Sequence, residues 1–263
     1  MPLPPKHSAQ NHLTSYYWSG DALRSRSVGA HVLAGSVDLP ALPPRLLADC
    51  EREILHQGLE AGDVEPLPWA RARARWPGYP AWVQAMSDWL RSFGLHNALA
   101  GSDVALMACL GARYHHDAAH YGSAAFCNLF LSEDKGLDVH FPHTGQRIPL
   151  RRGTALVFDT GQPHAVIPRH RNAFQAADFG PGQDCSQLFL TWELPIEDAH
   201  VAQALQLNFD VDTTSAQRLD AEQIWWRGAP AQVCPDTGQW RAASPDGSPT
   251  IAPPHSTQRP QLP

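Results

Sequence analysis

The sequence predicts a mainly β protein with flanking helices, in which helical segments come first and an antiparallel sandwich or barrel follows. From Asp103 to Leu194, short apolar or β-rich runs alternate with tight turns. Closely spaced strands of this kind favour an antiparallel sandwich or barrel over a parallel sheet with helices between its strands. The segments before Asp103 instead carry apolar residues at helical spacing.

Two amphipathic helices are predicted ahead of the β-rich part. The first runs from Pro44 to Gly58 and the second from Pro80 to Gly94, each with a proline near its start and a glycine at its end. The apolar stripe of the second helix consists of Trp82, Val83, Met86, Trp89, Leu90 and Phe93. Because aromatic side chains at helical spacing usually face a core, we expect these helices to pack against the outside of the barrel.

The strands are predicted from apolar runs of suitable length. These runs cover residues 103–116, 125–132, 154–159, 164–168 and 186–194. Turn-forming residues separate them, as in SEDKG, RRG, TGQP and FGPGQD. A short amphipathic segment at 197–207 is expected to pack outside the barrel.

The two ends of the chain differ in composition from the rest. Residues 1–14 and 245–263 are polar and rich in proline, and such segments bury too little apolar surface to become ordered, so we expect flexible tails. Residues 15–244 are expected to form a single domain whose β core covers about 103–194. The chain has 263 residues and is 43% hydrophobic, which is ample for one substantial core.

The charge and the cysteines exclude several classes of partner and cofactor. The formal net charge is −6 and the arginines are scattered, so no nucleic acid is expected as a partner. No run approaches the ~18 apolar residues of a membrane span, and the first residues contain no apolar run of a signal peptide. Five widely spaced cysteines without a CxxC pair indicate neither a disulfide framework nor a zinc knuckle. We therefore expect a cytoplasmic protein without a membrane partner, whose oligomeric state the sequence leaves open.

A candidate metal site is predicted from the segment GARYHHDAAHYG. It places His115 and Asp117 at the end of a predicted strand, where residues two apart point to the same face. A third ligand comes from FDTGQPHAVIP, in which His164 starts another short strand. Two histidines and one carboxylate on one face of an ion leave its other positions open, as in non-haem Fe(II) oxygenases. His115, Asp117 and His164 are therefore the predicted metal ligands and catalytic residues.

Other histidines of the same region compete for this role. Among them, His116 precedes Asp117 directly and would point to the opposite face of the strand, so it ranks below His115. The remaining competitors are His120, His140 and His143.

The order of the segments around the triad resembles the Fe(II)/2-oxoglutarate-dependent oxygenases, particularly their prolyl-hydroxylase-like branch. The segments are ARYHHD, FCNLFLS, GLDVHFP, IPLRRGTALVF and PHAVIP, and the resemblance covers roughly residues 103–194. It implies a double-stranded β-helix, the cupin-like jelly roll, with iron(II) at its open end and 2-oxoglutarate as co-substrate.

The sequence departs from the family pattern where the family binds the far carboxylate of 2-oxoglutarate. An arginine or lysine is expected about ten residues after the distal histidine, on the last strand. Phe174 lies at that spacing, and the last predicted strand begins with Ser186 and Gln187.

Four residues are candidates for contact with the co-substrate. Arg169 follows HAVIP and is placed at the deep end of that strand, while Arg113 lies two residues before His115 and is expected to share its inward face. We favour Arg169, keep Arg113 as the alternative, and rank Lys135 third because it belongs to a turn. Asn128 interrupts an apolar run and either hydrogen-bonds the keto acid or is satisfied by backbone groups.

The resemblance implies a dioxygenase that hydroxylates a small molecule or a peptide side chain. Two alternatives are a cupin-type metal enzyme that does not use 2-oxoglutarate and a non-catalytic β-barrel that binds or senses a ligand. The absence of a GxSxG elbow or a phosphate-binding glycine loop agrees with chemistry that needs no side-chain nucleophile.

Overall fold

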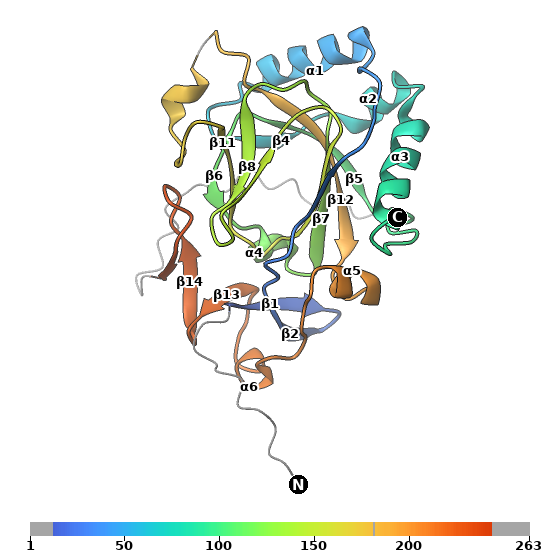
Figure 1. Ribbon diagram of the computed structural model, residues 1–263. Helices are drawn as coiled ribbons and strands as arrows, with labels where there is room; N and C mark the ends of the chain where they lie inside the picture. Colours follow the sequence, from blue (N-terminus) through green and yellow to red (C-terminus); the bar gives the residue numbers. More distant parts are fainter. Residues whose placement is uncertain (1–12, 181, 244–263) are drawn as a thin grey trace.

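Two antiparallel sheets form the centre of the protein. The computed structural model describes residues 13–180 and 182–243 (Figure 1). The larger sheet has six strands, in the order β3 (Leu33–Ser36), β10 (Thr154–Asp159), β7 (Ala124–Phe130), β12 (Gln187–Pro195), β5 (Val104–Cys109) and β4 (Val64–Pro66). The smaller sheet has four, in the order β6 (Ala112–His115), β11 (His164–Pro168), β8 (Leu137–Phe141) and β9 (Gln146–Pro149).

The two sheets face each other across a hydrophobic core. Phe141 on the smaller sheet and Phe158 on the larger one contact edge to face, with ring centroids 5.3 Å apart. Around them lie buried side chains from both sheets, among them Cys109, Phe130, Leu137, Val139, Leu156 and Phe189. Side chains alternate between the two faces of each strand, so the opposite face of the larger sheet is free to pack elsewhere.

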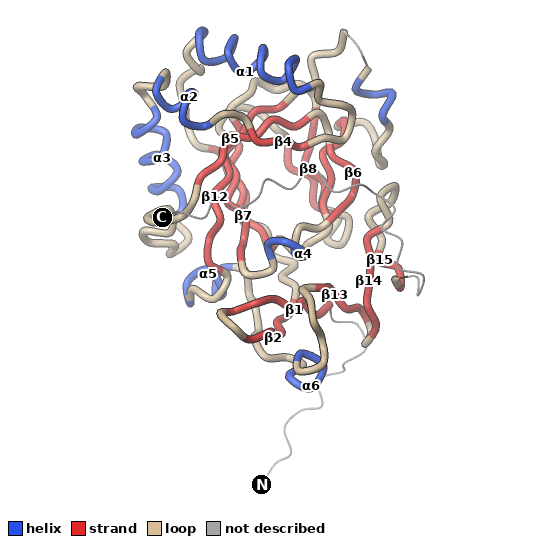
Figure 2. Tube along the Cα trace, turned by 180° about the vertical axis from the view of Figure 1, so that it is seen from behind, coloured by secondary structure: helices blue, strands red, loops and turns tan. Residues whose placement is uncertain are grey.

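Helices cover that opposite face (Figure 2). They are α1 (Pro44–Gln57), α2 (Trp69–Ala74) and α3 (Tyr79–Arg91). Helix α1 ends at Gly58, whose left-handed backbone (φ 65°) lets its N–H bond the last carbonyl groups of the helix. From α3, Trp82, Met86 and Leu90 are buried in one cluster with side chains of β5, β7, β10 and β12. This confirms the expected packing of the two N-terminal helices outside the β core.

A third sheet lies at one end of the two central sheets (Figure 1). Its strands are ordered β15 (Trp240–Ala242), β14 (Ala229–Val233), β13 (Gln223–Trp226), β1 (Leu13–Ser19) and β2 (Ala22–Ser27). Helix α4 (Ala118–Tyr121) packs between this sheet and β7. The remaining short helices are η1 (Ala176–Phe179), α5 (Ala199–Ala204) and α6 (Thr213–Ala216). The third sheet therefore covers the end of the molecule at which the segment after His115 emerges.

Most predicted strands are present. One predicted strand and the boundary of one predicted tail need correction. The run 103–116 is divided into β5 and β6 by a turn at Leu110 and Gly111, where Gly111 has a φ of 72°. The expected tail ended at residue 14, but Leu13 and Thr14 already belong to β1, because Leu13 is buried and pairs with Trp226. Residues 1–12 and 244–263, which include the rest of the expected tails, lie outside the described residues.

The described residues also bear on the cysteines and on membrane insertion. All five cysteines are free, as the absence of a paired pattern predicted. Within the two described ranges, no helix combines the length and apolar character that a membrane crossing requires.

Candidate metal centre

The three predicted ligands lie together at the end of the smaller sheet. One ligand atom each from His115, Asp117 and His164 lies within 4.8 Å of the others. The Nε2 atoms of His115 and His164 are each 3.6 Å from a different carboxylate oxygen of Asp117. This is too long for a hydrogen bond but suits three ligands that share one ion at ~2.0–2.2 Å from each. Within the described part of the chain, this is the group of histidine, cysteine and acidic residues with metal-binding geometry.

Strand pairing aligns the two histidines, whereas a turn positions the carboxylate. His115 at the end of β6 is the direct partner of His164 at the start of β11, so both side chains project to the same face. Strand β6 ends at His115, and Asp117 already has the helix-like backbone that precedes α4. Its N–H donates to the carbonyl oxygen of Thr160 at 2.8 Å, which ties Asp117 to the turn that leads to His164.

Each histidine is oriented by a backbone carbonyl. The Nδ1 atom of His115 lies 2.7 Å from the carbonyl oxygen of Arg113, and that of His164 lies 3.1 Å from the carbonyl oxygen of Gln162. A carbonyl oxygen only accepts, so Nδ1 carries a proton in both rings and Nε2 is the nitrogen turned toward Asp117. The rings therefore present the nitrogen that a metal requires.

Burial of His164 favours its neutral form. The ring is enclosed by Phe158, with centroids 4.9 Å apart, and by Phe141. This desolvation lowers the pKa of His164 to about 4, so the imidazole is uncharged at neutral pH. The second carboxylate oxygen of Asp117 is also buried, and no hydrogen-bond donor contacts it. A buried, unpartnered carboxylate oxygen beside two imidazole nitrogens is a donor set that fits a divalent cation.

The competing histidines lie outside this group. The ring of His116 packs beside Trp240, with centroids 5.4 Å apart, and His120 is exposed on α4. His140 projects from the outer face of the smaller sheet, where its Nδ1 lies 2.5 Å from the hydroxyl of Tyr114. His143 is exposed beyond the end of β8.

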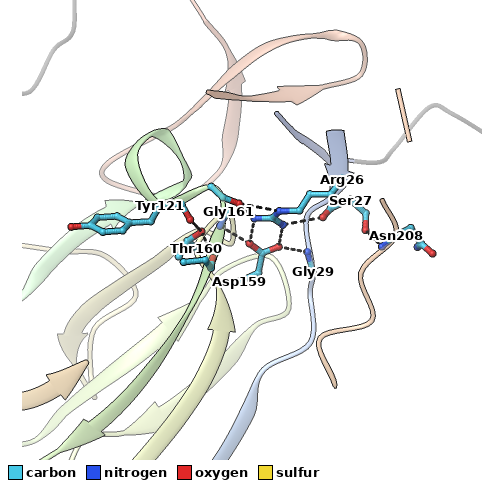
Figure 3. A network of polar contacts seen from close by, with 10 residues as sticks. Arg26, Ser27, Gly29, Tyr121, Asp159, Thr160, Gly161 and Asn208 are labelled. Atoms are coloured by element: carbon cyan, nitrogen blue, oxygen red, sulfur yellow. Dashed lines mark hydrogen bonds and ion pairs between the residues drawn. The ribbon is translucent and has the colours of Figure 1, made fainter. Parts of the chain in front are cut away.

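A buried ion pair holds the turn before His164 (Figure 3). Arg26 of β2 donates from its two terminal nitrogens to the two oxygens of Asp159, at 2.6 and 2.8 Å, and both side chains are 0% exposed. The backbone N–H groups of Gly29 and Gly161 donate to the same carboxylate. Arg26 also donates to the carbonyl oxygens of Gly122 and Ser27. Every charge of the pair is therefore met by hydrogen bonds, the condition under which a buried ion pair is tolerated.

The predicted co-substrate residue Arg169 is engaged at the surface. Its Nε donates to Asp138 at 2.9 Å, and a terminal nitrogen donates to Asp134 at 3.0 Å, while 44% of the side chain is exposed. β11 ends at Pro168, and the chain leaves the sheet directly after it. Arg169 therefore does not project into the space between the sheets.

The alternative Arg113 also points outward, for a reason that the sequence does not show. A β-bulge interrupts β6, so that His115 pairs with His164 but Ala112, not Arg113, pairs with Val166. Arg113 is thus displaced from the inward face and is exposed, with its guanidinium 4.8 Å from the ring centroid of Phe174. Lys135 contacts Asp184 and the carbonyl oxygen of Ser186.

Asn128 is on the inward face, and it has polar neighbours there. It pairs with Thr191 across β7 and β12, while Gln187 on the same face of β12 pairs with Cys109. Gln187 is 0% exposed, and neither atom of its amide has a hydrogen-bond partner; the amide oxygen of Asn128 and the hydroxyl of Thr191 are also buried without partners. Each such group costs about 1–3 kcal/mol unless something binds it.

Comparisons with known proteins give similarity at the level of overall structure. A crystal structure of a Pseudomonas putida prolyl-4-hydroxylase aligns with a TM-score of 0.39 at 21% identity, over 62% of this chain and 92% of that one. A viral collagen prolyl hydroxylase from Paramecium bursaria Chlorella virus-1, in complex with 2-oxoglutarate, aligns with a TM-score of 0.36 at 10% identity, over 64% and 96%. A non-heme alpha-ketoglutarate-dependent epimerase from nogalamycin biosynthesis aligns with a TM-score of 0.35 at 13% identity, over 62% and 78%. No family model and no curated protein matches the chain. Assignment of a function therefore depends on the side chains of the site itself.

Sequence reasoning missed the residues around the triad. Arg26 and Asp159 are separated by 133 positions, and neither stands in a recognisable motif. In the sequence, Gln187 differs from its surroundings only in being an uncharged residue where the resembled family has an arginine or lysine. A signal was available for Asp159, because a charged residue that follows the apolar run TALVF needs a partner if it is buried.

Proposed function

We propose that the protein is a non-haem iron(II)- and 2-oxoglutarate-dependent dioxygenase that hydroxylates a small molecule or a peptide side chain. In this proposal the two facing sheets are the double-stranded β-helix of that class. The observation that carries it is the convergence of two imidazoles and one carboxylate with an unpartnered oxygen at the end of the sheets. The net charge of −6 favours a small molecule or peptide over nucleic acid as the substrate.

The ligand residues and the aromatic residues beside them have separate roles. His115, Asp117 and His164 hold the metal on one face and leave its other positions open. When bound, iron(II) and 2-oxoglutarate supply the oxidising chemistry, in which dioxygen is consumed, the keto acid yields succinate and carbon dioxide, and a substrate C–H bond is hydroxylated. Phe158 and Phe141 exclude water on the inner side of the triad, which protects an oxidant from side reactions.

Access to the metal is from the side of His115. Its side chain is 37% exposed, compared with 11% for His164, so the open side of the triad adjoins His115. A substrate would therefore approach over His115, and the polar residues of β7 and β12 between the sheets would be the ones to hold the co-substrate.

Anaerobic titration with Fe(II) tests the metal site directly. The wild-type protein is expected to bind one equivalent, and His115→Ala, Asp117→Ala and His164→Ala are each expected to lose that binding. His143→Ala is the matched control, because His143 is an exposed histidine of the same region that contacts no member of the triad. Equal metal content in the control and the three variants would refute the site.

A second candidate function follows from the residues between the sheets. By strand register, the described inward-facing positions of both sheets include no lysine or arginine. This favours, as the alternative, a cupin-type metal enzyme that does not use 2-oxoglutarate. Dioxygen uptake coupled to succinate formation separates the two, because only the proposed dioxygenase makes one succinate for each dioxygen consumed.

A further inference from the structure

Three uncharged polar side chains share the inward face of two adjacent strands. Asn128 and Thr191 are direct partners across β7 and β12, and Gln187 lies four residues before Thr191 on the same face of β12. Phe189, between Gln187 and Thr191 on this face, stacks on Phe130 of β7, with centroids 5.2 Å apart. The polar groups are thus set in an apolar interior and not in a solvated loop.

These groups have unused capacity to hydrogen-bond a ligand. Both amide atoms of Gln187, the amide oxygen of Asn128 and the hydroxyl of Thr191 are buried and lack partners. The amide oxygens can only accept, the amide nitrogen can only donate, and the hydroxyl can do either. The set therefore suits a ligand that offers both a donor and an acceptor. Because both atoms of Gln187 are unpartnered, this conclusion is the same whichever way the amide is turned.

A cation is absent from the same place. None of the described inward-facing residues of the two central sheets is an arginine or lysine, and Arg113 and Arg169 have partners on the outside. The charged residue of β12 on this face, Glu193, is an anion and is exposed. A cation does lie at the start of β12: Lys135 donates to the carbonyl oxygen of Ser186 at 2.6 Å and contacts Asp184. Its ammonium group is therefore held at the end of β12 by groups of the chain itself.

We propose that the inner end of the co-substrate pocket is uncharged, and that Gln187 holds the distal end of a 2-oxo acid by hydrogen bonds alone, with Asn128 and Thr191 on the same face between it and the triad. The inference rests on the proposed function and deepens it. It makes the pocket unable to select a distal carboxylate over a distal carboxamide. A carboxylate meets the amide nitrogen of Gln187, while a carboxamide also donates to its amide oxygen.

The test compares three acids that differ only at the distal end. Binding of 2-oxoglutarate, its distal amide 2-oxoglutaramate, and the apolar-ended 2-oxopentanoate is measured by anaerobic calorimetry on the Fe(II)-loaded full chain. We expect the amide to bind within tenfold of 2-oxoglutarate, and both to bind more tightly than 2-oxopentanoate. A preference for 2-oxoglutarate over the amide of tenfold or more overturns the inference and leaves the proposed function intact. The measurement on the wild-type chain needs no variant to fold.

Variants then assign the effect to its residue. Gln187→Leu, which keeps the approximate volume, is expected to weaken 2-oxoglutarate and the amide about tenfold and to leave 2-oxopentanoate unchanged. Gln187→Arg is expected to shift the ratio of the two affinities at least tenfold toward 2-oxoglutarate, because arginine pairs only with the charged end. Equal affinities of the wild type and Gln187→Leu for all three acids would overturn the inference.

Lys135→Met is the matched control that tests whether the ammonium group of Lys135 reaches the pocket and binds the distal carboxylate. We expect it to leave the ratio of 2-oxoglutarate to amide affinity unchanged. A selective tenfold loss of 2-oxoglutarate binding in this variant overturns the inference, since it makes Lys135 the carboxylate partner. Fe(II) affinity is measured first in every sample. If the metal binds and none of the acids does, both the inference and the use of 2-oxoglutarate fail, while the metal site stands.

Discussion

Arg26 and Asp159 form an ion pair in which both side chains are completely buried, and this pair connects the third sheet to the turn before His164. The interaction is bidentate, and two glycine N–H groups complete the coordination of the carboxylate. Removing one member of such a pair leaves an uncompensated buried charge. The stability of the candidate metal centre is therefore linked to a residue far from it in sequence.

Arg26→Met is expected to lower the free energy of unfolding by about 3–5 kcal/mol, measured by urea denaturation of the metal-free protein. The double variant Arg26→Met/Asp159→Leu is expected to cost less than the sum of the two single variants, because it removes both charges. The matched control on the same strand is Arg24→Met. Arg24 pairs with Glu197 and Asp210 but is 35% exposed, so a loss of at most about 1 kcal/mol is expected. Equal losses in the two single arginine variants would contradict this assignment.

Thr160→Val is expected to weaken Fe(II) binding about tenfold, as measured by anaerobic titration. The Thr160 hydroxyl lies 2.8 Å from the carbonyl oxygen of Tyr121 and 2.9 Å from that of Ala124, and it fixes the turn whose backbone holds Asp117. Valine keeps the shape and removes these bonds. Thr154→Val at the start of β10, the strand that leads into this turn, controls for a general loss of stability. Unchanged metal affinity in Thr160→Val would show that the turn does not position Asp117.

Arg169→Gln is expected to leave the affinity for 2-oxoglutarate within twofold of the wild type, measured by calorimetry on the Fe(II)-loaded protein. The reason is that its guanidinium is occupied by Asp134 and Asp138 at the surface. The free energy of unfolding should fall by at most about 1 kcal/mol, because the side chain is 44% exposed. A tenfold loss of 2-oxoglutarate affinity would restore the role that the sequence suggested for this residue.

Alkaline pH is expected to destabilise the protein through its buried thiols. Burial raises the pKa of Cys109 from 9.0 to about 12, and burial also raises the pKa of Cys127. With folded-state pKa values above the unfolded value, the thiols contribute full stability below pH 9 and lose it as the pH rises toward 12. The free energy of unfolding should fall by up to about 1.4 kcal/mol per pH unit for each thiol. Urea denaturation between pH 8.5 and 10.5 checks this, and Cys109→Ala should reduce the slope; an equal slope in that variant would be the contrary result.

Local patterns predicted much of the fold because they depend on neighbours in the chain. The helix from Pro44 to Gln57 follows from its apolar spacing and from the glycine at position 58, and both features are visible in the sequence. The strand that carries His164 follows equally from its apolar run. By contrast, β1 and β2 were not predicted, since both carry many polar residues and β1 pairs with β13 near the other end of the described chain.

The candidate site shows the same division between its ligands and their surroundings. The sequence predicted His115, Asp117 and His164 as a group, and the structure brings their ligand atoms within 4.8 Å. It also suggested that Arg113 faces inward, which holds for an unbroken strand. The bulge in β6 moves the side chain of Arg113 away from the inward face, and no pattern in ARYHH predicts that bulge.

By itself, the sequence predicted the three residues of the candidate metal site and the approximate positions of two helices and several strands, and it determined that no cation stands at the start of the last predicted strand. The tertiary structure decided that Arg26 meets Asp159, that Arg169 is engaged at the surface, and that Gln187 is buried without a partner. The physical reason is the sequence separation over which each kind of interaction acts. Helix and strand periodicity is set by residues a few positions apart, whereas burial and the pairing of charges depend on contacts between segments that only folding brings together.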